Sequence, residues 1–417
     1  MLRGCPHLAS FQRRLPVTTC CLLLLASLVL AARASGQSCT GCGTNVPANS
    51  VISNTTWTTG SSPYCVQGNI TVNSLTIQPG VCVRLKPGAQ ILVQGRLNAD
   101  GTAAAPITFT AELTPKSSNR WGGLSFQTVP PGSSLRHCRI EFANNSGIEL
   151  VNSQSVIEDC LIADNTSPSH GGGLNAHGIA AGDLVLKRCR FERNASTGHG
   201  GGMRAELLAG VLRLEDCIFE ENTANPANAN TNLGVGGGVW IQTGASEIRN
   251  TFFRRNRANR RCDGCTVNGA GGGLYTNGDA VIENSIFQEN LVQTTEAGAF
   301  GQALGRGGAL YFAGSLLTIR NSILACNQLS VSGSSPLAQG GGLYLANGAA
   351  LLENTTIARN QREGVFVASS ALLAVNNAIV WENNNQGTQI VDQSGTAIVT
   401  YSCIQNSFPG MATICVP

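Results

Sequence analysis

Two short motifs alternate along most of this chain, and they constrain its fold more than any other feature. The first is a glycine cluster followed by an apolar residue, as in HGGGL at 170–174 and GGGLY at 340–344. The second is an apolar stretch that ends in asparagine, as in CIFEEN at 217–222. Repeats of such length are typical of stacked units that contact only their neighbours. The second motif ends at Asn165, Asn194, Asn222, Asn256, Asn290, Asn327 and Asn360, at intervals of 29, 28, 34, 34, 37 and 33 residues.

Each unit is predicted to consist of β-strands. Apolar and polar residues alternate with period two, and no stretch shows a helical period. One unit contains three short strand candidates, at 343–345, 350–352 and 355–357. We therefore predict an all-β fold, a single-stranded right-handed parallel β-helix (three-sheet solenoid) over 51–405, with an N-terminal segment or cap at 35–50 and a C-terminal tail at 406–417. The residues expected to stack inside it are Leu174, Met203, Val239, Leu274, Leu310 and Leu343.

Two polar columns are expected at the corners between strands. The first consists of the asparagines that end the second motif. Because Asn tolerates the left-handed backbone of a tight corner, we expect both columns to occupy such corners and to hydrogen-bond along the stack. The second column consists of Asp159, Asp216, Asn250, Asn284, Asn321 and Asn354, and Arg188 interrupts it.

The segments that vary most in length between repeats are 223–235, 257–270 and 291–306. We expect them to be loops on one edge of the solenoid.

The N-terminus has the features of a secretory signal peptide. Basic residues precede the apolar run CLLLLASLVLAA at 21–32, which is too short to span a membrane. Ala32-Arg33-Ala34 fits a cleavage site after Ala34, so residues 1–34 are expected to be removed, and Ala34-Ser35-Gly36 is a close alternative. The mature chain then has 27 − 4 = 23 basic and 24 acidic side chains, which argues against nucleic acid or an anionic membrane as a partner. We expect a secreted protein or one associated with a cell surface.

The alternation of GG[AG][LIV] with FxxN resembles the repeats of chlamydial polymorphic outer-membrane proteins, and more broadly those of bacterial right-handed parallel β-helix repeat-containing proteins. The resemblance covers about residues 50–405, from NTTW at 54–57 to VTYSCIQ at 399–405. It implies surface display or secretion, an adhesion-like role and no assigned catalytic residues. The chlamydial proteins carry a C-terminal translocator barrel, whereas this sequence stops at Pro417 without one. We therefore expect no membrane span or barrel encoded by the chain itself.

An aromatic column is the first candidate for a binding surface. In the strand after the glycine cluster, Leu343 and Leu345 should point inward, so Tyr344 should point outward. Stacked aromatic rings on a flat sheet could bind sugar rings or a partner protein. The alternative is a ladder that only stabilises the sheet, or one that loops cover. The same register places Phe366 outside, and the candidate binding residues are Trp240, Tyr275, Tyr311, Tyr344 and Arg204.

Polysaccharide-degrading enzymes are the main alternative on this fold. Pectate-lyase-like and glycosidase-like β-helices place acids, Arg or Lys on the outward face of one sheet. The outward column after the glycine cluster reads Asn175, Arg204, Trp240, Tyr275, Tyr311 and Tyr344, without a carboxylate to bind calcium or act as acid or base. We therefore predict a non-catalytic scaffold that binds glycan or protein ligands, without catalytic residues or cofactors. A solvated, charge-paired ladder is expected where Asp164, Glu221 and Glu289 alternate with Arg193, Arg255 and Arg359.

Two histidines precede glycine clusters in successive repeats. His170 and His199 could stack within reach of one metal ion. No third ligand occupies an analogous position, so we expect two polar corner residues and no metal site.

Removing the signal peptide takes away three of the 16 cysteines and leaves 16 − 3 = 13, so at least one is unpaired or bridges molecules. Local disulfides are expected at Cys39–Cys42 and Cys262–Cys265, because the two pairs lie too far apart for one zinc site and lack the context of a redox motif. Bridges Cys65–Cys82 and Cys403–Cys415 are expected near the two ends, which leaves Cys326 alone. A stack of buried thiols is expected at Cys138, Cys160, Cys189 and Cys217, in a column that Thr251, Ser285, Ser322 and Thr355 continue.

Overall fold

The computed structural model of the protein describes residues 39–406 except 180–181, 208, 228, 231–232, 243, 299–300, 385–386 and 395. The predicted signal peptide at 1–34 lies outside the described residues, as does almost all of the predicted tail. The 3₁₀ turn η1 (Thr59–Ser61) lies near the start of the described part. No helix there is long and apolar enough to cross a membrane.

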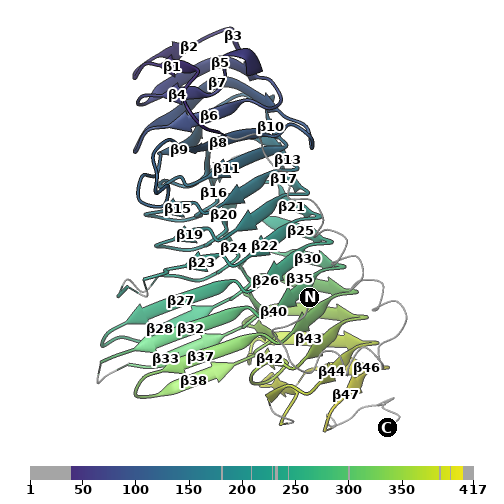
Figure 1. Ribbon diagram of the computed structural model, residues 1–417. Helices are drawn as coiled ribbons and strands as arrows, with labels where there is room; N and C mark the ends of the chain where they lie inside the picture. The colour runs from purple at the N-terminus through teal and green to yellow at the C-terminus, as the bar shows by residue number, and fades with distance from the viewer. Residues whose placement is uncertain are drawn as a thin grey trace.

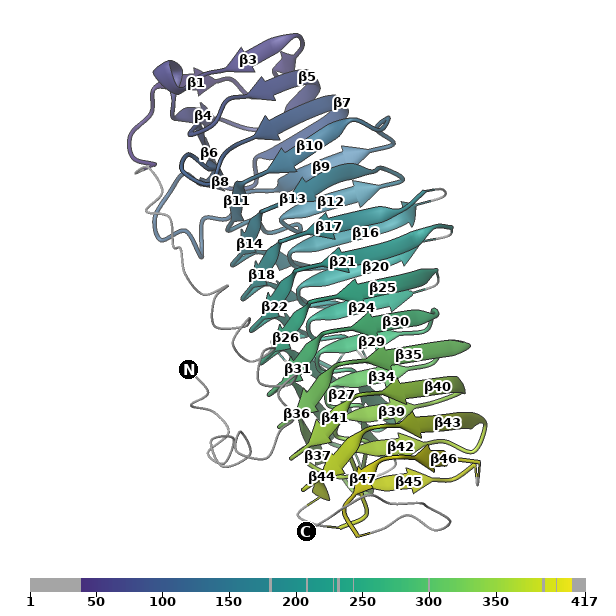
Figure 2. The same cartoon turned by 90° about the vertical axis from the view of Figure 1, so that its right-hand side faces the viewer.

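The described chain winds into a stack of coils, each of which contributes strands to three faces (Figures 1 and 2). Neighbouring coils pair through parallel strands. The predicted parallel β-helix is therefore confirmed. Face 1 is a 14-stranded sheet. It consists of β1 (Thr44–Val46), β4 (Tyr64–Val66), β6 (Cys82–Leu85), β8 (Ile107–Ala111), β11 (Cys138–Glu141), β14 (Leu161–Ala163), β18 (Arg190–Glu192), β22 (Ile218–Glu220), β26 (Phe252–Arg254), β31 (Ile286–Gln288), β36 (Ile323–Ala325), β41 (Thr356–Ala358), β44 (Ile379–Trp381) and β47 (Cys403–Ile404).

Faces 2 and 3 are joined into one 24-stranded sheet, because β5 (Ile70–Ile77) and β7 (Gln90–Asp100) extend across both faces. Face 2 continues with β2 (Val51–Ile52), β9 (Gly123–Gln127), β12 (Ile148–Val151), β16 (Leu174–Ile179), β20 (Met203–Leu207), β24 (Val239–Gln242), β29 (Leu274–Thr276), β34 (Leu310–Phe312), β39 (Leu343–Leu345), β42 (Val365–Val367) and β45 (Ile390–Asp392). Face 3 continues with β3 (Thr55–Trp57), β10 (Ser133–Arg136), β13 (Ser155–Glu158), β17 (Leu184–Lys187), β21 (Val211–Glu215), β25 (Ala245–Arg249), β30 (Ala280–Glu283), β35 (Leu316–Arg320), β40 (Gly348–Glu353), β43 (Ala371–Asn376) and β46 (Ile398–Thr400).

The interior is filled by columns of like residues. The predicted inward column is confirmed, because each member pairs in register with the next and all are buried. A second column on face 1 stacks aromatic rings, with centroids 4.4 to 5.2 Å apart. Such stacking adds to the area that each ring buries. The members of this second column are Phe191, Phe219, Phe253 and Phe287.

The first polar column forms a buried ladder of side-chain amides. Asn256 Nδ2 donates to Asn290 Oδ1 at 3.0 Å and to the Phe219 carbonyl oxygen at 2.8 Å. Asn256 Oδ1 accepts from the backbone N–H of Asn222 at 3.1 Å and from its Nδ2 at 3.0 Å. The same pattern repeats from Asn165 to Asn383. The predicted hydrogen bonding along the stack is confirmed for this column.

The left-handed corner lies one residue before each of these asparagines, so that part of the prediction is wrong. The φ angles of Asp164, Arg193 and Arg255 are 57°, 50° and 52°. The Asn side chain must point inward to join the ladder, and the turn is made by the preceding residue. The second polar column does take left-handed φ angles, with Asn250 at 51° and Asn354 at 49°.

The first glycine of each cluster is required by backbone conformation and space. Gly271 has a φ of +64°, and a Cβ atom there would lie 2.4 Å from the Leu274 carbonyl oxygen. That oxygen belongs to backbone and cannot move aside as a side chain could. Gly171, Gly200, Gly236, Gly307 and Gly340 occupy the same position with φ angles of +59° to +67°.

The variable segments are not loops but a projecting arm of paired strands, so the sequence expectation is wrong for 257–270 and 291–306. In Figure 1 this arm extends sideways from the green coils. Its two sheets pack small apolar residues such as Ala258, Val292 and Leu329 between them. The strands are β15 (Thr166–Ser167), β19 (Ala195–Ser196), β23 (Thr223–Ala224), β27 (Arg257–Cys262), β32 (Leu291–Glu296) and β37 (Gln328–Ser332) in one sheet, and β28 (Val267–Ala270), β33 (Ala303–Arg306) and β38 (Pro336–Gln339) in the other.

Two disulfides connect the N-terminal segment to the first coils in a pairing that differs from the predicted one. Cys39 is bonded to Cys82 and Cys42 to Cys65, which replaces the expected bridges 39–42 and 65–82. The register of β4 and β6 places Cys65 opposite Arg84, so Cys65 and Cys82 are offset along neighbouring strands. The chain before β1 lies beside both strands and reaches each of these cysteines. The local bridge Cys262–Cys265, at the tip of the arm, is confirmed.

The predicted stack of buried thiols is also confirmed. Cys138, Cys160, Cys189 and Cys217 are free and buried. Their thiols donate to backbone carbonyl oxygens, and the Thr251 and Thr355 hydroxyls continue the same contacts. The expectation that Cys326 stands alone is wrong, since Cys326 and Cys403 are both disulfide-bonded. Cys415 lies outside the described residues, so the bridge Cys403–Cys415 stays a prediction.

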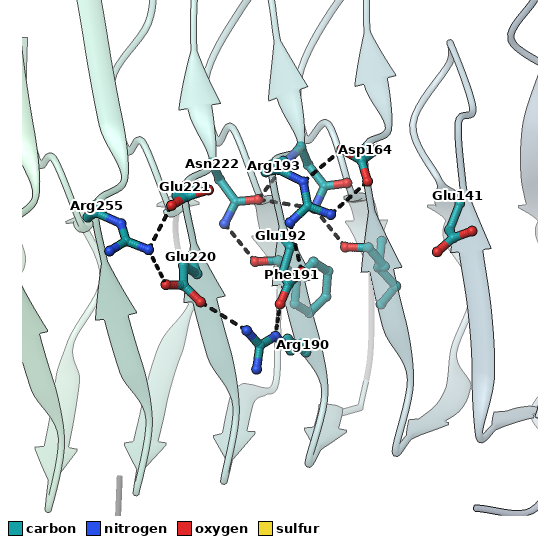
Figure 3. A network of polar contacts seen from close by, with 12 residues as sticks. Glu141, Asp164, Arg190, Phe191, Glu192, Arg193, Glu220, Glu221, Asn222 and Arg255 are labelled. Atoms are coloured by element: carbon teal, nitrogen blue, oxygen red, sulfur yellow. Dashed lines mark hydrogen bonds and ion pairs between the residues drawn. The ribbon is translucent and has the colours of Figure 1, made fainter. Parts of the chain in front are cut away.

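Charged side chains on the outside are paired between coils. Figure 3 shows Arg193 between Asp164 and Glu192, and Arg255 between Glu220 and Glu221, beside the asparagine ladder. The predicted charge-paired column is therefore confirmed over this part. Face 3 carries a longer row in which signs alternate on successive coils. Its members are Asp100, Arg136, Glu158, Lys187, Glu215, Arg249, Glu283, Arg320 and Glu353.

Candidate functional site

The predicted aromatic column exists on the outward side of face 2. Tyr275, Tyr311 and Tyr344 pair in register, and their rings stack with centroids 4.9 and 5.2 Å apart and planes within 4° of parallel. Trp240 precedes them at 6.4 Å, and Phe366 follows at 5.2 Å. The sequence therefore identified the column and its register.

The column is not the exposed surface that the sequence predicted. Trp240 and Tyr311 are each 8% exposed, Tyr344 5% and Phe366 4%, and only Tyr275 is partly exposed. Ala270 of the arm packs in the same apolar cluster as these rings. Removing aromatic rings of this size from water strongly stabilises the folded protein. The alternative of a covered ladder thus describes this column.

Three residues of the arm contact the rings. Burial raises the pKa of the Tyr311 hydroxyl to about 12, and the nearby Asn268 side chain of β28 acts in the opposite direction by lowering that pKa. The Arg306 guanidinium lies 4.9 Å from the centre of the Tyr344 ring. Arg260 of β27 is close enough to Tyr275 and Tyr311 to interact with both electrostatically. The arm is therefore fixed to face 2 by polar as well as apolar contacts.

Towards the N-terminus the ring stack continues in the two histidines. His199 lies 5.0 Å from Trp240, and His170 lies 5.1 Å from His199. The backbone N–H of His199 donates to His170 Nδ1 at 2.9 Å, and that of Val235 donates to His199 Nδ1 at 3.3 Å. Each neutral imidazole must therefore carry its proton on Nε2. These contacts make both histidines polar corner residues.

The described residues contain no group of three or more His, Cys, Asp or Glu side chains arranged to hold a metal ion. The Nδ1 atoms of both histidines already accept backbone hydrogen bonds. The cysteines considered for a zinc site are in disulfides.

Beside the histidines, face 2 carries a group of polar side chains on three successive coils, all of them half-buried except the buried Asn175. We call this group the polar cluster. Arg204 extends over the Trp240 ring, with its guanidinium carbon 5.5 Å from the ring centre. It pairs with Glu206 and donates to Asn175 Oδ1 at 3.2 Å. Its Nε is buried and has no hydrogen-bond partner. The polar cluster consists of Glu149, His170, Asn175, His177, His199, Arg204 and Glu206.

Glu149 was missed in the sequence and corrects the statement that this column has no carboxylate. It pairs in register with Asn175 and therefore belongs to the outward column of Arg204 and Trp240. No glycine triplet precedes the strand of Glu149, so this coil lacks the motif by which the column was recognised in the sequence. His177 Nε2 lies 3.6 Å from Glu149 Oε1, and Ser125 Oγ donates to Glu149 Oε2 at 2.9 Å. The hydrogen bond with His177 lowers the pKa of Glu149.

His199 should make the fold sensitive to acid. Burial, followed by the charges of His170, Arg260 and Arg204, lowers its pKa from 6.5 to about 3. The unfolded chain binds a proton there near pH 6.5 and the folded chain only near pH 3, so the contribution to stability is complete above pH 6.5 and declines as the pH falls towards 3. We expect the free energy of unfolding to fall more between pH 7 and pH 4 in the wild type than in His199→Gln, measured by urea denaturation. Equal falls would contradict this.

The chain belongs to the right-handed β-helix family. The family model described as "Right handed beta helix region" matches residues 67–257 and 235–412, well over half of the sequence. No curated protein and no solved structure matches the chain. The family supplies the handedness of the coil and fits a scaffold or a pectin-lyase-like protein, and it leaves the function to the site itself.

Proposed function

We propose that this chain is a secreted or cell-surface scaffold that binds a glycan or protein ligand without transforming it, at the polar cluster of face 2. The observation that carries the proposal is the change along the ring stack. From Trp240 onwards the rings are buried, apart from the partly exposed Tyr275, whereas towards the N-terminus the stack ends among partly exposed hydrogen-bonding groups. The side chains of His177 and Glu206 are 31% and 29% exposed. Such convergent polar groups beside aromatic rings are typical of binding sites.

The geometry suits an extended ligand. Equivalent outward side chains lie about 4.8 Å apart on neighbouring coils, so several coils can contact a chain-like ligand at once. The cluster offers donors at Arg204 and at the histidine Nε2 atoms, and acceptors at Glu149 and Glu206. Sugar hydroxyls and peptide groups both satisfy such mixed sets.

Three further observations support placement outside the cell. The N-terminal sequence has the pattern of a signal peptide. Disulfides at Cys39–Cys82, Cys42–Cys65 and Cys262–Cys265 are typical of exported proteins. The repeats resemble those of chlamydial polymorphic outer-membrane proteins, which supports an adhesion-like role. The near-neutral charge of the mature chain does not favour nucleic acid as the ligand.

A pectate-lyase-like or glycosidase-like enzyme is the second candidate, because Glu149 and Glu206 place carboxylates on this face. Glycosidases need one carboxyl group that keeps a proton at working pH. The His177 contact lowers the pKa of Glu149, which opposes that role. Cleavage of a bound glycan by the wild type and its loss in Glu149→Gln would overturn the scaffold proposal.

The binding proposal makes a direct prediction. A glycan array probed with the mature protein should identify a ligand, and His177→Ala and Glu206→Gln should each weaken its binding about tenfold or more, since a hydrogen bond to a charged group is worth ~1.5–3 kcal/mol. Isothermal titration calorimetry would measure the change. Lys187→Ala on face 3 is a matched control, with a side chain 36% exposed and one ion pair to Glu215. Unchanged binding in both cluster variants, or equal loss in the control, would refute the site.

A further inference from the structure

A phenylalanine occupies a left-handed corner between face 1 and face 2. Phe142 follows β11 with a φ of 64°, a conformation that bulky side chains rarely adopt and that clusters at ligand and active sites. On later coils the residue at this corner is mostly charged, as at Asp164, Arg193 and Glu221. The Phe142 ring packs against the core and remains partly exposed. The turn alone therefore does not account for an aromatic residue here.

The segment between β8 and β9 brings two cations to this ring. Lys116 Nζ lies 5.6 Å from the centre of the Phe142 ring, and Arg120 Cζ lies 5.9 Å from it. Lys116 Nζ also donates to Thr110 Oγ1 of β8 at 3.0 Å. Thr110 pairs in register with Arg84 of β6, whose charge is close enough to act on Lys116. We call Arg84, Lys116 and Arg120 the basic cluster.

The basic cluster has no carboxylate of its own. The two acids whose charges act on it are already paired, Glu141 with Arg139 and Asp164 with Arg193 (Figure 3). In the described part of the chain no ion pair joins the cluster to an acid, and every acidic residue of the sequence lies in that part. Its two arginines donate to backbone carbonyl oxygens instead. Three positive charges therefore meet without an anionic partner.

The cluster is also partly removed from water. Burial lowers the pKa of Lys116, the Glu141 charge opposes this, and the Arg84 and Arg139 charges add to it. An anion bound among half-buried cations is attracted more strongly than in bulk water, and it offsets the repulsion between them. The Lys116 ammonium has three N–H donors, of which Thr110 accepts one. The cluster thus has both the charge and the donors that an anion site needs.

We propose that the basic cluster binds the anionic group of an acidic polysaccharide, whose sugar ring contacts the exposed part of the Phe142 ring. Sulfate esters and carboxylates are the anionic groups considered, and Lys and Arg bind both through charge-assisted hydrogen bonds. An aromatic ring beside the cations supplies an apolar contact for the sugar. This site is separate from the polar cluster and does not rest on the function proposed above.

Three forms of one polymer test the proposal on the full-length chain secreted with its own leader. Dextran sulfate and carboxymethyl dextran carry the two anionic groups on the same backbone, and dextran carries neither. Surface plasmon resonance should detect binding of a charged form and none of dextran, and the form that binds more tightly identifies the anionic group. Lys116→Met should weaken this binding about tenfold or more, because a hydrogen bond to a charged group contributes that much affinity.

Lys187→Met is the matched control, because Lys187 lies on face 3 with its side chain 36% exposed, and the same charge is lost there. This variant should bind charged dextran as the wild type does. Phe142→Asn removes the ring but keeps a residue that tolerates the left-handed backbone, and it should weaken binding of charged dextran. Melting curves establish that all three variants are folded.

The proposal is overturned if neither charged dextran binds, or if Lys187→Met loses as much affinity as Lys116→Met. Unchanged binding in Lys116→Met or Phe142→Asn also overturns it, and a lower melting temperature in the same variant would show that these contacts only anchor the segment to the coil. Poly-glutamate that binds as tightly as the charged dextrans would assign the surface to acidic peptides instead. Binding at the polar cluster is tested with His177→Ala, so either proposal can fail without the other.

Discussion

Replacing Asn256 with alanine should lower the free energy of unfolding by about 3–6 kcal/mol. Asn256 is fully buried, and its amide satisfies the backbone N–H and the Nδ2 of Asn222 as well as the carbonyl oxygen of Phe219. Each of these groups would remain buried without a partner, at a cost of ~1–3 kcal/mol. Urea denaturation followed by circular dichroism would measure the loss.

The matched control lies in the other polar column. Asn354 is exposed, and its φ is 49°. Asn354→Gly keeps the left-handed backbone accessible and removes only two exposed side-chain hydrogen bonds, so the change should stay below ~1 kcal/mol. If both variants lost the same stability, the buried ladder would not be the stabilising element described here.

Replacing Tyr311 with alanine should lower stability by about 3–4 kcal/mol and leave ligand binding unchanged. The ring is stacked on both sides and buried, so truncation removes apolar contacts and leaves a cavity. It also removes the contact with Asn268, which helps to fix the arm. Hydrogen exchange should therefore accelerate in β28 and β33, measured by mass spectrometry beside the melting curve.

Tyr311→Phe separates the hydroxyl from the ring. It retains the stack and removes only the buried hydroxyl near Asn268, so at most about 1 kcal/mol of stability should be lost. Should Tyr311→Ala instead abolish ligand binding with little change in stability, the aromatic column would be the binding surface after all, as the sequence suggested.

The features that recur from coil to coil could be predicted from the sequence. The inward position of Leu343, the asparagine ladder through Asn256, the thiol at Cys189 and the register of Tyr311 all follow from strand alternation and from the spacing of two motifs. Local periodicity is enough for these features, because every coil has the same neighbours above and below.

Features that depend on contacts between unlike segments could not be predicted. The arm has no repeat motif, so its strands were predicted to be loops. Because the arm was not predicted, the burial of Tyr344 under Arg306 was not predicted either. The cysteine pairs at the N-terminus required the path of the chain before β1. Glu149 escaped notice because its coil lacks a glycine triplet. The left-handed φ of Arg193 is set by stacking, since Arg has no preference for it.

The alternating row on face 3 restricts how this chain can change in length. Its structural period is one coil, but its electrostatic period is two coils, since Glu215, Arg249 and Glu283 follow one another. Deleting or duplicating a single coil would bring two like charges into direct cross-strand contact, which is destabilising. Two coils could be gained or lost together without that penalty. Viable length variants of this solenoid should therefore differ by even numbers of coils within this region.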